Sequence, residues 1–214
     1  IAKGALFSYP QDKILAQIEN DLQQRAKEIW ITSQDNASYG LDRDENELPE
    51  LLTKILSLKH NFKLRLGMMN PNHLYPIQDE ILKLYHSPKL YKFLHIPIQS
   101  ASNKILKDMN RPYKIEQVKE IIKKFKKEIP DITIATDIIT SYPTETEQDH
   151  KQNLEFIKEF KPDVFNLSKF SSHKSTKAGK LLILDKELIN KRASELMELH
   201  RKTAMENNRP KKYP

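Results

Sequence analysis

The sequence contains no cysteine among its 214 residues, and this absence removes several kinds of site at once. Disulfide bonds, thiolate zinc sites and cysteine-held iron–sulfur clusters are excluded within these residues. Seven histidines are present, but none of them forms an HxxH or HExxH pattern. The spacing therefore does not favour a histidine metal site either.

Long apolar runs are also missing, and none approaches the roughly 18 residues that a membrane-spanning helix needs. The first residues, IAKGALFSYPQ, have too short an apolar stretch for a secretory signal. The default expectation from these two absences is a cytoplasmic location.

Glycine is scarce, with four residues in the whole chain. No GxGxxG follows any predicted strand, which disfavours a Rossmann dinucleotide site. No GxxxxGKS/T pattern occurs, which excludes a P-loop. The common glycine-rich phosphate-binding loops are thus not the basis of function here.

Positive charge is in excess and unevenly placed. The net charge is +7, and residues 163–214 contain 12 Lys or Arg against 6 Asp or Glu. A basic end favours contact with phosphate groups of a nucleic acid. Solvated, lysine-rich helix faces are the alternative that charge alone leaves open.

Short β-branched or aromatic runs alternate along the chain with longer helical patterns. Such alternation predicts a parallel sheet with right-handed crossovers, either an open doubly wound sheet or part of a barrel. The first predicted element is a helix, as if a first strand were missing. The expected strands are 28–32, 63–69, 90–98, 132–139 and 164–170, and the expected helices are 14–22, 48–59, 77–86, 105–109, 115–128, 147–160 and 185–207.

Polar segments follow each predicted strand. In parallel α/β sheets the ligand crevice lies at the carboxyl ends of the strands, so these segments are candidates for a shared site. Each of them taken alone is also typical of a turn or a helix cap. The segments are 32–35, 67–71, 99–102, 140–146 and 171–176.

An ordered set of motifs covers residues 3–205 and resembles the radical S-adenosylmethionine methylthiotransferases. The subgroup it is most similar to is the archaeal and eukaryotic enzymes that methylthiolate threonylcarbamoyladenosine next to the tRNA anticodon. Single motifs such as IPIQS are moderately specific, whereas the set in its order is highly specific. The motifs are EIWITSQDNASYGLD, LPELL, RLGMMNPNHL, YKFLHIPIQSASNKILKDMNRPY, DITIATDIITSYPTETEQDH and the segment ending in KST.

The resemblance implies a fold and a domain plan. The expected fold is α/β, a partial parallel (β/α)6-type barrel that lacks its first strand and cluster loop, over residues 1–207. Residues 208–214 are expected to be a basic tail or a linker toward an RNA-binding domain. Lys3 stands where the family has an arginine just after its third cluster cysteine, so the chain is expected to begin downstream of that loop.

The resemblance also implies a chemistry. The family holds a [4Fe–4S] cluster on three cysteines spaced CxxxCxxC, and the cluster's fourth iron chelates S-adenosylmethionine. Reductive cleavage then yields a deoxyadenosyl radical, and a second cluster supplies sulfur. Because thiolates are required to hold such a cluster, these residues alone are expected to be inactive. The expected partners of the full-length enzyme are S-adenosylmethionine and tRNA, with the reductant unidentified.

Candidate cofactor-binding residues come from the strand-end segments that match the family. Arg65 lies between Leu64 and Leu66, and the period of two residues in a strand makes its side chain point away from theirs. The forked guanidinium group of Arg65 suits the cofactor carboxylate, and a structural ion pair is the alternative. Asp35 could instead make an Asx turn, and Ser100 or Ser102 could cap the following helix. The full set is Thr32, Gln34, Asp35, Arg65, Asn70, Gln99, Ser100, Ser102 and Asp137.

Four of these side chains should surround one cavity at the carboxyl ends of the strands, because they sit at or near strand ends of a parallel sheet. They are Gln34, Arg65, Ser100 and Asp137.

The glycines of the family pattern are replaced in this chain at Ala101, Ser141 and Thr144. Glycine permits positive φ and a close approach of the backbone to a ligand, so the contact with the adenosine part of the cofactor is in doubt.

Basic residues after the last predicted strand are the candidate RNA-binding residues. They are Lys169, His173 and Lys174, and solvated side chains are the alternative interpretation. Two other functions stay open: the same chemistry on another substrate, such as a ribosomal protein side chain, and a cluster-less barrel that only binds RNA.

Overall fold

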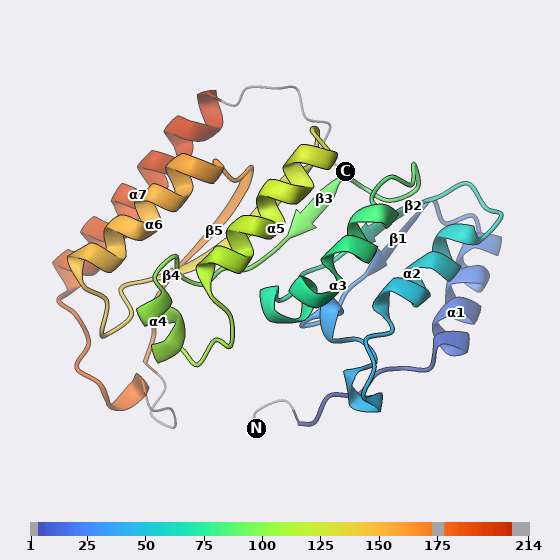
Figure 1. The fold of residues 1–214 in the computed structure, drawn as a ribbon, viewed down its shortest axis with the longest axis horizontal. Helices are drawn as coiled ribbons and strands as arrows, with labels where there is room; N and C mark the ends of the chain where they lie inside the picture. The colour runs from blue at the N-terminus through green and yellow to red at the C-terminus, as the bar shows by residue number, and fades with distance from the viewer. Residues whose placement is uncertain (1–3, 173–177, 207–214) are drawn as a thin grey trace. The chain divides into compact units, whose positions relative to one another are not determined.

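The computed structural model describes residues 4–172 and 178–206 (Figure 1). The chain divides into two compact units. Unit 1 contains the residues up to His95 together with Lys124–Ile132, and unit 2 contains Ile96–Lys123 together with the residues from Thr133 onward.

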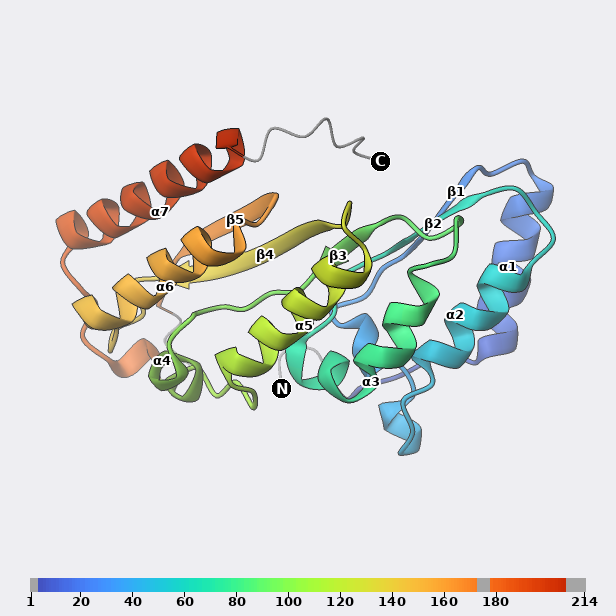
Figure 2. The same ribbon diagram turned by 45° about the horizontal axis from the view of Figure 1, so that its top comes forward.

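Unit 1 is built on the parallel strands β1 (Glu28–Ile31) and β2 (Lys63–Leu66), which pair Ile29 with Leu64. Its helices α1 (Gln11–Gln23), α2 (Leu48–Ser57) and α3 (Pro71–Leu84) lie side by side on one face of these strands, as Figures 1 and 2 show. The short strand β3 (Phe93–His95) follows. Ile29, Leu64 and Leu66 are buried, whereas Trp30 is 54% exposed. The period of two residues in a strand thus places Trp30 and Arg65 on the face opposite the helices.

Unit 2 is built on the parallel strands β4 (Thr133–Thr140) and β5 (Val164–Lys169). The segment 96–99 runs beside β4, because Ile96 N donates to Ala135 O at 2.9 Å and Ile139 N donates to Gln99 O at 2.9 Å. α7 (Lys186–Glu206) packs against α6 (Glu147–Phe160) and β5. The unit also contains α4 (Asn103–Asp108) and the first part of α5 (Ile115–Glu128).

Most predicted elements are confirmed, and several of their boundaries are wrong, as for the strand expected over 63–69, which ends at Leu66. The helix expected over 77–86 begins at Pro71, because Pro71 occupies its first position and Pro76 is accommodated within the helix. The strand expected over 90–98 is regular only at Phe93–His95. In the helix expected over 115–128, the apolar side chains that recur at helical spacing are all buried, namely Ile115, Val118, Ile121, Ile122 and Phe125. No helix in the described ranges is long and apolar enough to cross a membrane.

The expected fold class is confirmed in its coarser form, an α/β fold with parallel strand pairing. Within the described residues the strands form two sheets that do not close. The partial barrel therefore stays a prediction, and so do the proposed limits at residues 207 and 208.

Candidate functional site

Asp35, at the carboxyl end of β1, joins the loop after β1 to the loop after β2 by hydrogen bonds. Its Oδ1 accepts hydrogen bonds from Ala37 N at 3.1 Å and Asn70 N at 2.8 Å. Its Oδ2 lies 2.6 Å from His73 Nδ1. The Asx-turn interpretation of Asp35 is thus confirmed, and the carboxylate that the resemblance assigns to the cofactor already holds three partners. The sequence did not single out His73, because only the fold brings α3 beside this loop.

Gly67 allows the ends of β1 and β2 to meet closely. A Cβ atom at this position would lie 2.8 Å from Asn36 Nδ2 and 2.9 Å from Ile31 O. Asn36 in turn donates from both its backbone N and its Nδ2 to Met68 O, each at 2.9 Å. The two strand-end loops therefore form one hydrogen-bonded unit, and Gly67 is the position at which any side chain would separate them.

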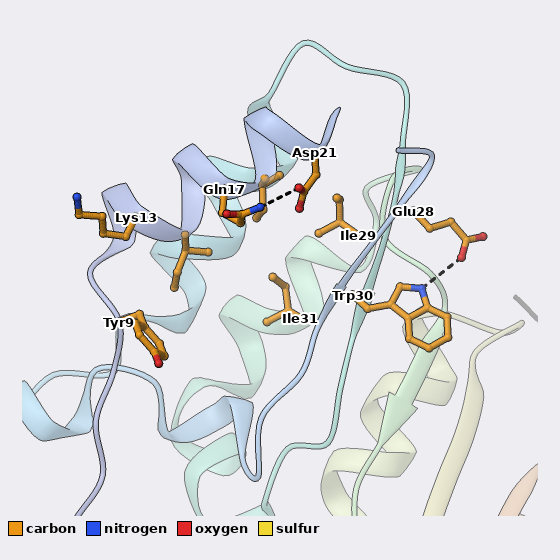
Figure 3. Close-up of a pocket in the computed structure, with 10 residues that line it drawn as sticks. Tyr9, Lys13, Gln17, Asp21, Glu28, Ile29, Trp30 and Ile31 are labelled. Atoms are coloured by element: carbon orange, nitrogen blue, oxygen red, sulfur yellow. Dashed lines mark hydrogen bonds between the residues drawn. The ribbon is translucent and has the colours of Figure 1, made fainter. Parts of the chain in front are cut away.

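Two grooves flank β1. Figure 3 shows the larger, about 510 Å³, in which Ile29 and Ile31 point toward α1 while Trp30 points the other way. The smaller, about 340 Å³, lies at the carboxyl end of β1 and is lined in part by Thr32 and Asp35. The smaller groove therefore contains two of the predicted cofactor-binding residues.

Three further polar groups stand near these loops. Thr32 and Gln34 are exposed, so they are accessible to a ligand. Asn70 Oδ1 is buried and has no hydrogen-bond partner among the described residues. A buried acceptor without a donor costs free energy, which makes Asn70 the predicted residue most in need of an additional partner.

Arg65 is held between two aromatic rings. Its Cζ lies 4.6 Å from the ring centroid of Trp30 and 4.5 Å from that of Phe93. No hydrogen bond or direct ion pair joins its guanidinium to another residue of the described ranges, although its charge helps to lower the pKa of Glu28. The ring contacts, rather than the ion pair considered from the sequence, therefore hold it. Stacking fixes the plane of the guanidinium and leaves its N–H groups available to an anion.

The strand-end loops of unit 2 contain two residues in the left-handed region. Gln99 has φ of 63° and Ser141 has φ of 62°. Ser141 replaces a glycine of the family pattern, and it keeps a conformation that glycine adopts more easily. Ser141 therefore adopts the left-handed turn at a cost of about 1 kcal/mol, and contact with adenosine at this loop stays a prediction.

Two side chains of α6 hold the loop 99–102. Asn153 Oδ1 accepts from Ala101 N at 2.7 Å, and Asp149 Oδ1 accepts from Ser102 Oγ at 2.6 Å. Desolvation opposes ionisation of Asp149, yet hydrogen bonds from Ser102 and Thr146 hold its pKa well below the usual range. Ser102 also caps α4 by accepting from Ile105 N, which confirms the capping interpretation. The hydroxyls of Ser100 and Ser102 are buried in this arrangement, so a ligand would meet the loop through other atoms.

Comparison with protein families decides the assignment. The model of the radical SAM superfamily matches residues 2–157.

The chain belongs to the radical SAM superfamily.

Proteins with curated names resemble this radical SAM chain over nearly its whole length. It is 41% identical over 208 residues to a probable threonylcarbamoyladenosine tRNA methylthiotransferase of Archaeoglobus fulgidus, covering 97% of this chain and 49% of that protein. It is 38% identical over 213 residues to the Methanocaldococcus jannaschii protein with the same name, covering 100% and 49%. The human threonylcarbamoyladenosine tRNA methylthiotransferase is 37% identical over 197 residues, covering 91% and 34%. The chain thus spans about half the length, or less, of these relatives.

Solved structures support the fold assignment alone. Coproporphyrinogen III oxidase from Escherichia coli matches with a TM-score of 0.58 and 15% identity, covering 90% of this chain and 46% of that one. The radical enzyme OxsB with aqua-cobalamin and S-adenosylmethionine bound gives a TM-score of 0.57 at 14% identity, covering 90% and 26%.

The superfamily implies S-adenosylmethionine and a [4Fe–4S] cluster, and the residues of this chain fit the two groups differently. The chain has no thiolate, and no group of three or more His, Asp or Glu in the described ranges could hold a metal ion. The donor set for the cluster is therefore not within this radical SAM chain. The stacked Arg65 and the unpaired Asn70 Oδ1 suit a ligand that carries a carboxylate and a hydrogen-bond donor.

The remaining predicted residues have structural partners. Asp137 Oδ1 accepts from Asn166 Nδ2 at 2.9 Å, and Lys169 Nζ donates to Asn190 Oδ1 at 2.8 Å. His173 and Lys174 lie outside the described residues. Because Gln34 and Arg65 belong to unit 1 while Ser100 and Asp137 belong to unit 2, their convergence on one cavity stays a prediction.

A buried ion pair lies beneath the loop after β4, and the sequence pattern did not reveal it. Arg192 Nη1 donates to Glu145 Oε1 at 3.0 Å and to Glu145 O at 3.1 Å. Ser141 N donates to the same Oε1 at 3.1 Å. Arg192 is 4% exposed and Glu145 is 4% exposed. A charged residue on a long amphipathic helix is usually solvated, so only the packing of α7 against the loop could have revealed this pair.

Replacement of Glu145 by glutamine is expected to change the pH dependence of stability. Burial raises the pKa of Glu145 to about 7, against the lowering effects of Ser141 and Arg192. A folded pKa above the ordinary value means that the contribution of Glu145 to stability is complete below about pH 4.5 and is lost as the pH rises through about 7. The free energy of unfolding of the wild type minus that of Glu145→Gln should fall by roughly 3 kcal/mol over this window.

Chemical denaturation at several pH values measures this difference. Groups that titrate identically in both proteins cancel in the subtraction. A difference that stays constant between pH 4.5 and 7 would show that the pKa of Glu145 is not raised on folding.

Proposed function

We propose that this chain is the radical SAM barrel of a tRNA methylthiotransferase that adds a methylthio group to N6-threonylcarbamoyladenosine beside the anticodon. The observation that carries the proposal is identity of 36–41% to archaeal relatives with that name over 97% or more of the chain. Since the chain spans about half of those relatives, the whole protein is proposed to supply the cluster cysteines and an RNA-binding domain elsewhere. A cytoplasmic location goes with this role.

S-adenosylmethionine supplies the radical chemistry when it is bound with the cluster. The residues of this chain are proposed to bind and orient it. Arg65 pairs with its carboxylate through the edge of the stacked guanidinium. Asn70 Oδ1 is buried without a partner in the described structure, so the amide of Asn70 is proposed to turn toward the amino group when the cofactor binds. Thr32 and Gln34 provide further hydrogen bonds at the exposed end of β1.

Within unit 2, the strand-end residues Gln99, Ser100, Ser102 and Asp137 are proposed as cofactor-binding residues on the family resemblance alone. Gln99 and Ser141 turn the backbone at the ends of segment 96–99 and β4, which presents peptide groups to the adenosine. The buried hydroxyls of Ser100 and Ser102 would serve the cofactor by holding the loop 99–102, and Asp137 accepts from Asn166 Nδ2 in the described structure. The positioning of Ser100 and Ser102 depends on the hold of α6 on this loop.

A chimera tests the function directly. Residues 1–214 replace the matching half of the Methanocaldococcus jannaschii relative, which aligns with 100% of this chain. The chimera is expected to form the methylthiolated nucleoside in a host that lacks its own enzyme, measured by mass spectrometry of digested tRNA. The unaltered relative is the positive control, and a chimera without its cluster cysteines is the negative control.

Two outcomes would contradict the proposal in different ways. Cleavage of S-adenosylmethionine without methylthiolation of the tRNA would retain the chemistry and remove the substrate, which favours another target such as a ribosomal protein side chain. A folded chimera that holds its cluster but does not cleave S-adenosylmethionine would favour a barrel that binds RNA without catalysis.

A further inference from the structure

An open groove of about 760 Å³ lies around α4 and the turn that leads into α5. Its lining includes four cationic side chains, Lys104, Lys107, Arg111 and Lys114, and no carboxylate. The amides of Asn110 and Gln117 also face it. A concave surface with this composition is suited to a polyanion with hydroxyl groups, because the cations bind phosphates and the amides both donate and accept hydrogen bonds.

Three of the four cations are available. Lys107 and Lys114 are exposed, and neither ammonium group has an acceptor among the described residues. Arg111 is half-buried, and its buried Nε has no acceptor in the same part of the chain, so a phosphate would be met by the other nitrogens of its guanidinium. Lys104 is different, because its Nζ donates to Asp149 Oδ2 at 2.9 Å.

The nearest carboxylates are occupied by other donors. Asp108 accepts the hydroxyl of Thr144. Glu116 accepts two bonds from Asn103 Nδ2, at 2.9 and 3.1 Å. Neither forms a direct ion pair with Lys107, Arg111 or Lys114 in the described structure, although the charge of Lys114 helps to lower the pKa of Glu116. The cationic groups that line the groove outnumber these two flanking carboxylates, so the groove keeps an excess of positive charge.

The groove lies at the carboxyl ends of segment 96–99 and β4. α4 is tied to the loop after β4 because Tyr142 Oη donates to Asp108 O at 3.0 Å and Lys104 Nζ donates to Thr144 O. Ligands of parallel α/β sheets enter at this edge. A macromolecular substrate of unit 2 would therefore pass over α4.

We propose that this groove binds the sugar–phosphate backbone of RNA, with Lys107, Arg111 and Lys114 on phosphates. The fork of Arg111 suits a phosphate, and the amides of Asn110 and Gln117 suit ribose hydroxyls. The choice of tRNA as that RNA rests on the proposed function. An acidic protein would meet the same cations, but the amides favour RNA: Asn110 can both donate and accept, and Gln117 can donate from Nε2 while its Oε1 accepts from Lys114 N at 2.9 Å.

The test compares tRNA affinity of the 214-residue chain and its variants over a range of salt concentrations. Lys107→Gln with Lys114→Gln should weaken binding about tenfold at low salt. Each lost phosphate contact should lower the log–log salt slope by about 0.7–0.9. Adding Arg111→Gln should weaken binding further, and Arg111→Lys should recover only part of that loss because the fork is missing.

A matched variant controls for total charge. Lys151→Gln, Lys158→Gln and Lys186→Gln remove three exposed lysines from α6 and α7 of the same unit. Their tRNA affinity should change less than threefold, and thermal unfolding of every variant should stay near that of the wild type. Equal weakening by both sets would overturn the groove in favour of a general charge effect.

Unchanged tRNA affinity in the groove variants would also overturn it. If those variants at the same time lost binding to polyglutamate, the groove would instead be assigned to an acidic protein partner. The same substitutions in the chimera separate this proposal from the proposed function. If the chimera methylthiolates tRNA but its tRNA affinity does not depend on the groove residues, only the groove proposal is wrong. If tRNA affinity depends on the groove residues but no methylthiolation occurs, only the proposed function is wrong.

Discussion

Arg192→Ala is expected to lower the free energy of unfolding by about 3–5 kcal/mol at about pH 8. Arg192 and Glu145 are buried beneath the loop after β4, and their side chains are 3.0 Å apart. Without the guanidinium, an ionised Glu145 would keep only the Ser141 amide at Oε1, while Oε2 has no partner among the described residues. Removing one partner of a buried pair is costly, because the carboxyl must then stay ionised without its partner or take up a proton at the expense of the free energy of folding.

The double variant Glu145→Gln with Arg192→Met separates the charge from the packing. Both charges are removed, side-chain volumes are nearly kept, and the Oε1 atom of the introduced glutamine would still accept from Ser141 N, so most of the lost stability should return. The exposed neighbour Lys191→Ala should change stability by less than about 0.5 kcal/mol. Denaturant titration measures all three variants. A double variant as unstable as Arg192→Ala would show that packing of the arginine stem, rather than the unpaired charge, is what matters.

The sequence predicted local structure well where one segment contains its own signal. The helix over 147–160 was predicted at its observed limits, and Thr146 caps it in a capping box with Asp149. The face of Arg65 followed from the burial of Leu64 and Leu66, since side chains alternate along a strand. Such features depend on neighbours within a few residues.

Features that depend on distant segments were not predicted. A structural ion pair was the alternative for Arg65, but its neighbours in the described structure are the rings of Trp30 and Phe93. Asp35 reaches His73 on α3, which nothing in the local pattern of either residue indicates. Packing between distant segments decides which polar atoms already have hydrogen-bond partners within the protein. A motif alone therefore could not tell a residue that contacts the ligand from one that holds two loops together.

Arg65→Met in the chimera is expected to weaken S-adenosylmethionine binding by at least about 30-fold, which corresponds to about 2 kcal/mol or more. The guanidinium is stacked between Trp30 and Phe93, so it is pre-positioned and its edge is available to the cofactor carboxylate. Methionine keeps an apolar stem between the rings and removes only the charged fork. Arg65→Lys should recover little, because an ammonium group neither stacks as a plane nor binds a carboxylate through two parallel bonds.

The structural contribution of the stack can be measured apart from the ligand contact. Two ring contacts at a half-exposed site contribute roughly 1–2 kcal/mol to stability, so Arg65→Met should lower the free energy of unfolding by no more than that. Lys63→Met removes a neighbouring charge on the same strand and should leave cofactor affinity within about threefold, because Lys63 is exposed and donates to Pro88 O. Affinity is measured by equilibrium dialysis with labelled S-adenosylmethionine. If Arg65→Met loses stability but binds the cofactor as tightly as the unaltered chimera, Arg65 serves the fold of unit 1 and the carboxylate is held by another group.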